Sequence, residues 1–168
     1  MGVEIERKFL VKGDAWRAGA RTIAMRQGYL STDPDRTIRV RVEGDRATLT
    51  IKGRSSGNAR REYNVPMDRG DAVELLDLAV GAVIEKTRYL IETDGVLWEV
   101  DEFQGANAGL VVAEVEGESE AALATAVARA PDWLGREVSD DTRFFNAALA
   151  ERPFAAWPVQ ERSEVSGG

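Results

Sequence analysis

Acidic and basic side chains occur in closely spaced, like-charged pairs along this sequence, and such pairs can bind a charged ligand together with metal ions. One residue separates the two members of each pair, so on a β-strand both would lie on the same face. The pairs are Glu4/Glu6, Arg39/Arg41, Lys86/Arg88, Glu99/Asp101 and Glu114/Glu116. Single charges at Lys8, Lys52 and Glu62 extend the pattern.

Ordinary solvated surface explains this spacing poorly, although antiparallel sheets often carry charges on one wet face. Alternate residues on a strand lie about 6.6 Å apart. Two like charges at that distance repel by roughly 0.6–2.5 kcal/mol for effective dielectric constants of about 80 to 20. Carboxylates bind hard divalent cations, whereas Arg and Lys bind phosphate oxygens. A metal–polyphosphate complex would neutralise both kinds of pair, so we expect a ligand of this class.

The composition narrows the chemistry further. The chain has 168 residues, enough for one domain with a core, and contains no cysteine or histidine. Thiolate nucleophiles, imidazole catalysis and Cys- or His-ligated metals are therefore excluded. Oxygen ligands favour Mg²⁺, Mn²⁺ or Ca²⁺. The net charge of −7 argues against nucleic acid as a partner. Charge begins at Glu4 and no apolar run could span a membrane, so we expect a cytoplasmic protein without a membrane partner.

Charged and apolar residues alternate along most of the chain, which predicts strands joined by short turns. We expect strands at 3–12, 23–29, 37–43, 47–52, 61–65, 84–92, 96–103 and 110–116, and helices at 71–80, 119–130 and 142–151. Residues 1–157 should form one domain, and the polar segment 158–168 should be a disordered tail. Strands with few helices favour an antiparallel α+β architecture.

The charged face must enclose its ligand, which requires the sheet to curl. A barrel of about eight strands has room for one small ligand. A dry lumen full of unpaired charge is implausible because each buried ion costs several kcal/mol. We therefore predict an eight-stranded antiparallel β-barrel, or tunnel, with a charged lumen and helices packed outside. The helix around Phe144 and Phe145 should pack on the outer sheet, and a plug at one tunnel end is the alternative.

A set of short motifs in fixed order resembles a known family. They are Glu4-Ile5-Glu6-Arg7-Lys8, Gln27-Gly28-Tyr29-Leu30, Arg39-Val40-Arg41, Leu49-Thr50-Ile51-Lys52-Gly53, Arg61-Glu62-Tyr63, Lys86-Thr87-Arg88-Tyr89, Trp98-Glu99-Val100-Asp101 and Ala113-Glu114-Val115-Glu116. The set resembles the CYTH domain, also called the triphosphate tunnel metalloenzymes, over about residues 1–150. The resemblance implies a metal-dependent hydrolase that acts on triphosphates inside an eight-stranded tunnel.

The resemblance also implies roles for individual residues. Mg²⁺ or Mn²⁺ would be held by Glu4, Glu6, Asp101, Glu114 and Glu116. Phosphate oxygens would be bound by Lys8, Arg39, Arg41, Lys52, Lys86 and Arg88. The catalytic set would comprise Lys8, Arg39, Arg41, Glu62 and Asp101. Glu99 is open between a ligand contact and a structural partner of an arginine, and Tyr29 between a substrate contact and closure of the barrel rim.

Four activities stay open at this point. The first expectation is cleavage of the terminal phosphoryl group of inorganic triphosphate, since the short chain has no evident base-binding domain. A nucleoside or thiamine triphosphatase comes second and an adenylate cyclase third. A non-catalytic polyphosphate-binding module is the alternative from another class. The expected partner is a small triphosphate, and a homodimer is left open.

Overall fold

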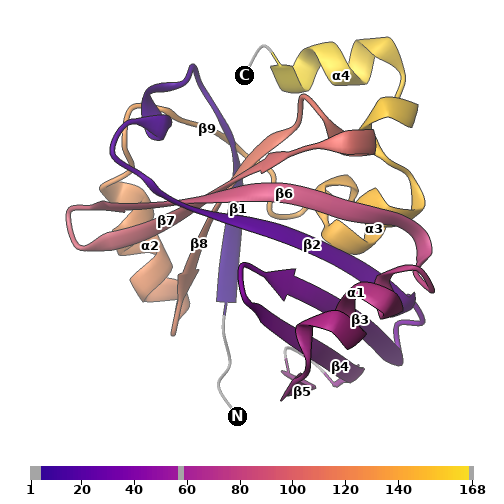
Figure 1. The fold of residues 1–168 in the computed structure, drawn as a ribbon. Helices are drawn as coiled ribbons and strands as arrows, with labels where there is room; N and C mark the ends of the chain where they lie inside the picture. Colours follow the sequence, from indigo (N-terminus) through magenta and orange to yellow (C-terminus); the bar gives the residue numbers. More distant parts are fainter. Residues whose placement is uncertain (1–4, 57–58, 167–168) are drawn as a thin grey trace.

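The computed structural model describes residues 5–56 and 59–166, and these form a curled antiparallel sheet with helices on both sides (Figure 1). The nine strands of the described part run in the order β5-β4-β3-β2-β6-β7-β8-β1-β9. Their bounds are β1 Ile5–Val11, β2 Arg21–Ser31, β3 Arg36–Glu43, β4 Arg46–Ser56, β5 Ala59–Pro66, β6 Val80–Thr93, β7 Val96–Phe103, β8 Val111–Gly117 and β9 Leu134–Glu137.

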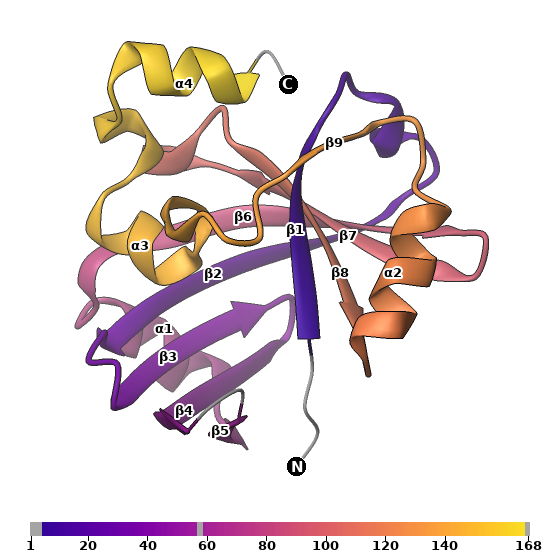
Figure 2. The same cartoon turned by 180° about the vertical axis from the view of Figure 1, so that it is seen from behind.

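The sheet curves until its two halves face each other across a hollow. Seen from behind, β1 and β8 lie opposite β3 and β4 (Figure 2). The predicted antiparallel curled sheet with a charged inner face is confirmed. The strand count differs by the short β9, whose Leu-Gly-Arg-Glu sequence has no apolar alternation. Within the described residues the hydrogen-bonded order ends at β5 and at β9, so backbone pairing does not close the tunnel into a ring.

Two helices cover the outer face, as the alternating pattern predicts. Helix α1 (Arg69–Leu76) buries Leu76 in a cluster with Val40 and Val42. Helix α2 (Glu120–Ala128) buries Leu123 against Val100 and the β8 residues beside it. Because strand side chains alternate between faces, this outward apolar packing turns the charged residues between them inward.

The chain must approach the sheet closely where α1 ends. A Cβ atom at Gly28 would lie 2.8 Å from the Cβ of Ala79, closer than side chains normally come. Glycine at this outward-facing position of β2 therefore lets the end of the α1 segment lie directly on the strand.

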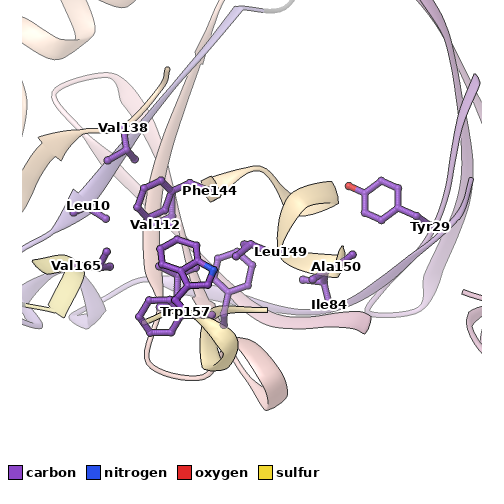
Figure 3. Close-up of a cluster of buried hydrophobic side chains, with 13 residues drawn as sticks. Leu10, Tyr29, Ile84, Val112, Val138, Phe144, Leu149, Ala150, Trp157 and Val165 are labelled. Atoms are coloured by element: carbon purple, nitrogen blue, oxygen red, sulfur yellow. The ribbon is translucent and has the colours of Figure 1, made fainter. Parts of the chain in front are cut away.

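The C-terminal segment packs on the inner face instead. It comprises a 3₁₀ turn at Thr142–Phe144, helix α3 (Asn146–Glu151), a second turn at Phe154–Ala156 and helix α4 (Val159–Ser166). Leu149 and Phe144 lie in one buried cluster with Leu10, Ile84 and Val112 (Figure 3). These three strand residues share the inward face with the charged residues two positions away. The expectation that Phe144 packs on the outer sheet is wrong, and the alternative of a plug at one end holds. The turn Thr142–Phe144 and helix α3 are called the plug below.

The expected disordered tail is wrong for residues 159–166, which form α4. Val165 is buried in the same cluster as the plug, and Arg143 donates to Glu161 over 2.8 Å. The polar composition of this segment concealed these two anchoring contacts.

Among the described residues, none of the helices has both the length and the apolar character needed to cross a membrane.

Candidate active site

The strand register places the described site residues on the inner face, where three of the cross-strand pairs join a cation to a carboxylate and another joins two carboxylates. Across β1 and β8, Lys8 lies opposite Glu114 and Glu6 opposite Glu116. Across β6 and β7, Arg88 lies opposite Asp101. On the facing half, Lys52 lies opposite Glu62 across β4 and β5, while Arg39 and Arg41 lie on β3. The predicted metal ligand Glu4 lies outside the described residues.

Asp101 is the centre of a buried ion-pair cluster. Its Oδ1 accepts from Arg88 Nε over 2.7 Å, and its Oδ2 accepts from Arg88 Nη2 over 2.8 Å and from Lys86 Nζ. The side chains of Asp101 and Lys86 are completely buried. Burial alone would raise the pKa of Asp101, but Lys86 and Arg88 together hold this pKa well below its usual range. Both oxygens are thus used by cations and the side chain has no exposed surface, and together these two features favour Asp101 as an anchor for these cations over a metal ligand.

The cluster continues across the sheet from β6 to β1. Arg88 also donates to Glu99, and its Nη2 lies 3.3 Å from Glu114 Oε2. Lys8 Nζ donates to Glu114 Oε1 over 2.6 Å and lies 3.1 Å from Glu6 Oε1. Burial would lower the pKa of Lys8, but Glu114 and Glu6 outweigh it and raise the pKa. Lys8 therefore stays protonated at neutral pH. The hydrogen bond from Arg88 makes Glu99 a structural partner of an arginine.

The two arginines of β3 have neutral partners instead. Arg41 Nε donates to Gln27 Oε1 over 2.9 Å, and Arg39 Nη2 donates to Thr50 Oγ1 over 3.3 Å. In the described part of the chain, neither guanidinium forms an ion pair with a carboxylate, and the buried Nε of Arg39 has no hydrogen-bond partner. Burial, followed by repulsion from Arg39 and Arg88, lowers the pKa of Arg41 to about 10. This half of the lumen holds positive charge that an anion would neutralise.

A chain of polar side chains supports this half from behind Arg39. Thr50 Oγ1 lies 2.7 Å from Asn64 Oδ1, and Asn64 Nδ2 donates to Glu62 Oε1 over 3.1 Å. Lys52 lies 2.9 Å from Glu62. Burial would raise the pKa of Glu62, but the hydrogen bonds from Lys52 and Asn64 lower it. Glu62 is therefore an ionised partner of Lys52 at neutral pH.

A cavity of about 270 Å³ lies between the two halves. It is lined by Glu6, Lys8, Tyr29, Thr37, Arg39, Thr50, Lys52, Phe145, Asn146 and Ala147. Four predicted site residues thus line it together, whereas the buried Lys86–Asp101 pair does not. Tyr29 lines the cavity and also belongs to the apolar cluster of the plug, so it fits both expectations for it. A larger, more open hollow of about 550 Å³ follows residues 136–142, but its lining has one basic residue, Arg136.

Sequence reasoning missed several polar residues of the site. Gln27 lies directly opposite Arg41, and Thr50 and Asn64 each lie two residues from a charged residue of the same strand, Lys52 and Glu62. All three therefore share the inner face with the charged residues, and the same alternation could have found them. Asn146 carried no such signal because it comes from the plug, whose docking on the inner face depends on long-range packing.

The carboxylates of β1 and β8 are the candidates for holding a metal. Glu6 on β1 and Glu116 on β8 are cross-strand partners, and Glu114 lies two residues before Glu116 on β8. Oxygen donors alone suit Mg²⁺, Mn²⁺ or Ca²⁺. Within the described residues no three acidic, imidazole or thiol side chains are close enough to share an ion. The donor types suit a hard divalent ion, while the described carboxylates by themselves do not form such a group.

The comparison with known protein families agrees with this charged, curled sheet. The family model of the CYTH domain matches residues 2–145. The chain belongs to the CYTH domain family. This family is metal-dependent in general.

Two relatives and two solved structures are similar to this chain. Proteins named inorganic triphosphatase from Acetivibrio thermocellus and Nitrosomonas europaea are 47% and 39% identical to it. The first alignment covers 92% of this chain and 97% of that protein, the second 88% and 96%. The crystal structure of an inorganic triphosphatase matches with a TM-score of 0.70 and 36% identity, over 89% of this chain and 95% of that one. A putative adenylate cyclase from Bacillus halodurans shares the fold with a TM-score of 0.56 and 18% identity, over 86% and 98%.

Proposed function

We propose that this CYTH protein is a metal-dependent hydrolase that removes the terminal phosphoryl group of inorganic triphosphate. The observation that carries the proposal is the pair Arg39 and Arg41, two inward guanidinium groups with neutral partners beside an acidic wall. The names of the two relatives, at 47% and 39% identity, support the same substrate.

The division of charge in the lumen fits a metal–triphosphate complex. On the wall of β6, β7, β8 and β1, three cations pair with the four carboxylates Glu6, Glu99, Asp101 and Glu114. The facing wall carries the cations Arg39, Arg41 and Lys52. Among the described residues, the one ion pair that these three cations form is the pair of Lys52 with Glu62. A triphosphate placed between the walls would have its oxygens toward the arginines and its cations toward the carboxylates.

Glu6, Glu114 and Glu116, together with Glu4, would hold Mg²⁺ or Mn²⁺. When bound, such an ion supplies positive charge and lowers the pKa of water. The protein's own contribution is positioning and charge compensation, the main requirements of phosphoryl transfer. Arg39 and Arg41 would bind phosphate oxygens, and Lys8 would offset negative charge that develops on the transferred group. Asp101 would hold Arg88 and Lys86 in place.

The size of the cavity favours inorganic triphosphate over an organic triphosphate. Pockets for drug-sized ligands typically measure about 300–1,000 Å³ and are predominantly apolar. The cavity here is about 270 Å³, and its only aromatic lining residues are Tyr29 and Phe145. A nucleoside would need more apolar wall than this, and the plug on the inner face limits extension at that end.

Product analysis with three substrates tests the proposal. The protein is incubated with inorganic triphosphate, ATP or thiamine triphosphate and Mg²⁺ or Mn²⁺. Rapid release of phosphate and pyrophosphate from inorganic triphosphate is expected. Cyclic AMP with pyrophosphate from ATP would instead show a cyclase, and stoichiometric binding without turnover a polyphosphate-binding module.

A matched pair of arginine variants links that activity to the lumen. Arg39→Ala should abolish most turnover because it removes a guanidinium that lines the cavity. Arg36→Ala should leave turnover unchanged, since the Arg36 side chain is 76% exposed and pairs with Asp33 at the strand start. Equal activity of the two variants would contradict the proposed site.

A further inference from the structure

A completely buried neutral amide lies beside Arg41. Gln27 on β2 is the cross-strand partner of Arg41 on β3, and its side chain has no exposed surface. Its Oε1 accepts from Arg41 Nε over 2.9 Å. A guanidinium only donates hydrogen bonds, so the amide oxygen must face it and the NH₂ group must point away. The Gln27 Nε2 atom is buried and has no hydrogen-bond partner among the described residues.

We propose that Gln27 is a positioning residue that orients Arg41 for phosphate without pairing its positive charge with a carboxylate. The amide occupies the Nε donor, so the Nη donors stay available for phosphate oxygens. This inference rests on the proposed function in taking triphosphate as the anion.

The contrast with Arg88 shows why a neutral partner matters. Arg88 uses Nε, Nη1 and Nη2 on the carboxylates of Asp101, Glu99 and Glu114, so its charge and donors are already satisfied within the protein. Arg41 occupies an equivalent inward position two strands away but receives an amide. A carboxylate at position 27 would hold Arg41 equally well and would compete with the anion for the same charge.

The pKa of Arg41 agrees with this interpretation, because burial, Arg39 and Arg88 lower it to about 10 and the opposing effect of the Asp101 and Glu43 carboxylates is smaller. The unpartnered Gln27 Nε2 is also unfavourable in the ligand-free protein, since a buried donor without an acceptor keeps its full desolvation cost.

Three variants separate positioning from simple structural support. Gln27→Glu keeps the size and the acceptor but adds a negative charge beside Arg41. Gln27→Met keeps the approximate size and removes the acceptor. Gln104→Glu makes the same charge change at an exposed residue whose amide donates to Thr87, and it serves as the matched control.

Binding of inorganic triphosphate is measured by titration calorimetry in EDTA, turnover with Mg²⁺ by phosphate release, and stability by thermal melting. Gln27→Glu should bind triphosphate at least about tenfold more weakly and show a raised KM, because the new carboxylate offsets the Arg41 charge. Its melting temperature should equal or exceed that of the unmodified protein. Gln27→Met should also bind more weakly, and Gln104→Glu should match the unmodified protein.

Each outcome decides a different question. Triphosphate affinity of Gln27→Glu within about twofold of the Gln104→Glu control would overturn the inference, since a purely structural role tolerates the isosteric change. If the unmodified protein binds triphosphate without hydrolysing it, the proposed function fails and the Gln27 inference still stands or falls on the measured affinities. If the unmodified protein does not bind triphosphate, both fail.

Discussion

Replacing Asp101 by Asn tests whether this residue is an anchor for cations or a metal ligand. The change removes the negative charge that Lys86 and Arg88 share, and the Lys86 side chain has no exposure to water. Removing one partner of a buried ion pair costs roughly 3–5 kcal/mol, because the other charge is left uncompensated. For a domain of this size, that loss lowers the melting temperature by about 6–20 °C.

The pH dependence gives this prediction a second, independent readout. Folding lowers the pKa of Asp101 below its ordinary value of 3.8, so the stabilisation is present above that value. It is lost as the pH falls through the lower pKa of the folded state. The amide of the Asp101→Asn variant cannot titrate, so the stability difference between the unmodified protein and the variant should be largest near neutral pH. The difference should shrink progressively below the ordinary value.

Urea denaturation at neutral pH and at several acidic pH values measures both effects. Glu85→Gln is the matched control, because it neutralises a carboxylate whose pair with Arg26 is half exposed. Its loss should be below about 1 kcal/mol. The reasoning is refuted if Asp101→Asn loses no more stability than this control. A variant of normal stability that needs far more Mg²⁺ for turnover would establish Asp101 as a metal ligand.

Three further expectations follow from the same geometry. Arg41→Met should lower kcat/KM for triphosphate by roughly 10²–10³-fold, the loss typical of a preorganised charge-stabilising donor. Urea denaturation should show a loss of at most roughly 1–3 kcal/mol, because the buried Gln27 amide loses its donor; an unchanged kcat/KM would count against a role of Arg41 in binding triphosphate. EDTA should abolish phosphate release, and added Mg²⁺ or Mn²⁺ should restore it. Glu6→Gln and Glu116→Gln should each raise the metal concentration needed for half-maximal activity. A metal titration that neither substitution changes would remove both residues from the proposed ligand set. Leu149→Ala should cost roughly 2–5 kcal/mol as a buried Leu-to-Ala change, measured by thermal melting, and a negligible loss would mean that α3 does not plug the lumen.

Alternation along the strands predicted which face the charged residues occupy, and for the described residues of the paired strands this part of the prediction was correct. Val40 and Val42 lie under α1, whereas Arg39 lines the cavity and Arg41, on the same face of β3, contacts Gln27, as a period of two requires. The plug could not be predicted in the same way. Phe144 and Leu149 are apolar at helical spacing, which fits either face of a curled sheet, and the choice depends on contacts with strands more than 30 residues away in the sequence.

The role of each charged pair was harder to predict, because a like-charged pair on one strand does not reveal what lies opposite. The Lys86/Arg88 pair was expected to bind phosphate. The hairpin turn Asp94-Gly95 has both residues at positive φ, 53° and 75°, which fits the two-residue turn typical of such hairpins. That turn pairs Thr93 with Val96 and therefore sets Arg88 opposite Asp101. The register was encoded locally, and it makes this pair part of a buried ion-pair cluster.

The same reasoning applied to the β3–β4 hairpin gives the opposite result, and the difference separates the two kinds of charge in this lumen. Its two-residue turn pairs Glu43 with Arg46 and so sets Arg41 opposite Thr48 and Arg39 opposite Thr50. Threonine cannot neutralise a guanidinium, and the strand on the other side offers Arg41 only the amide of Gln27. Two pairs of cations with identical spacing therefore differ in their surroundings, because one hairpin supplies carboxylates opposite them and the other supplies neutral groups. In the proposed function, the cations that form no ion pair with a carboxylate among the described residues are the ones that bind the anionic substrate.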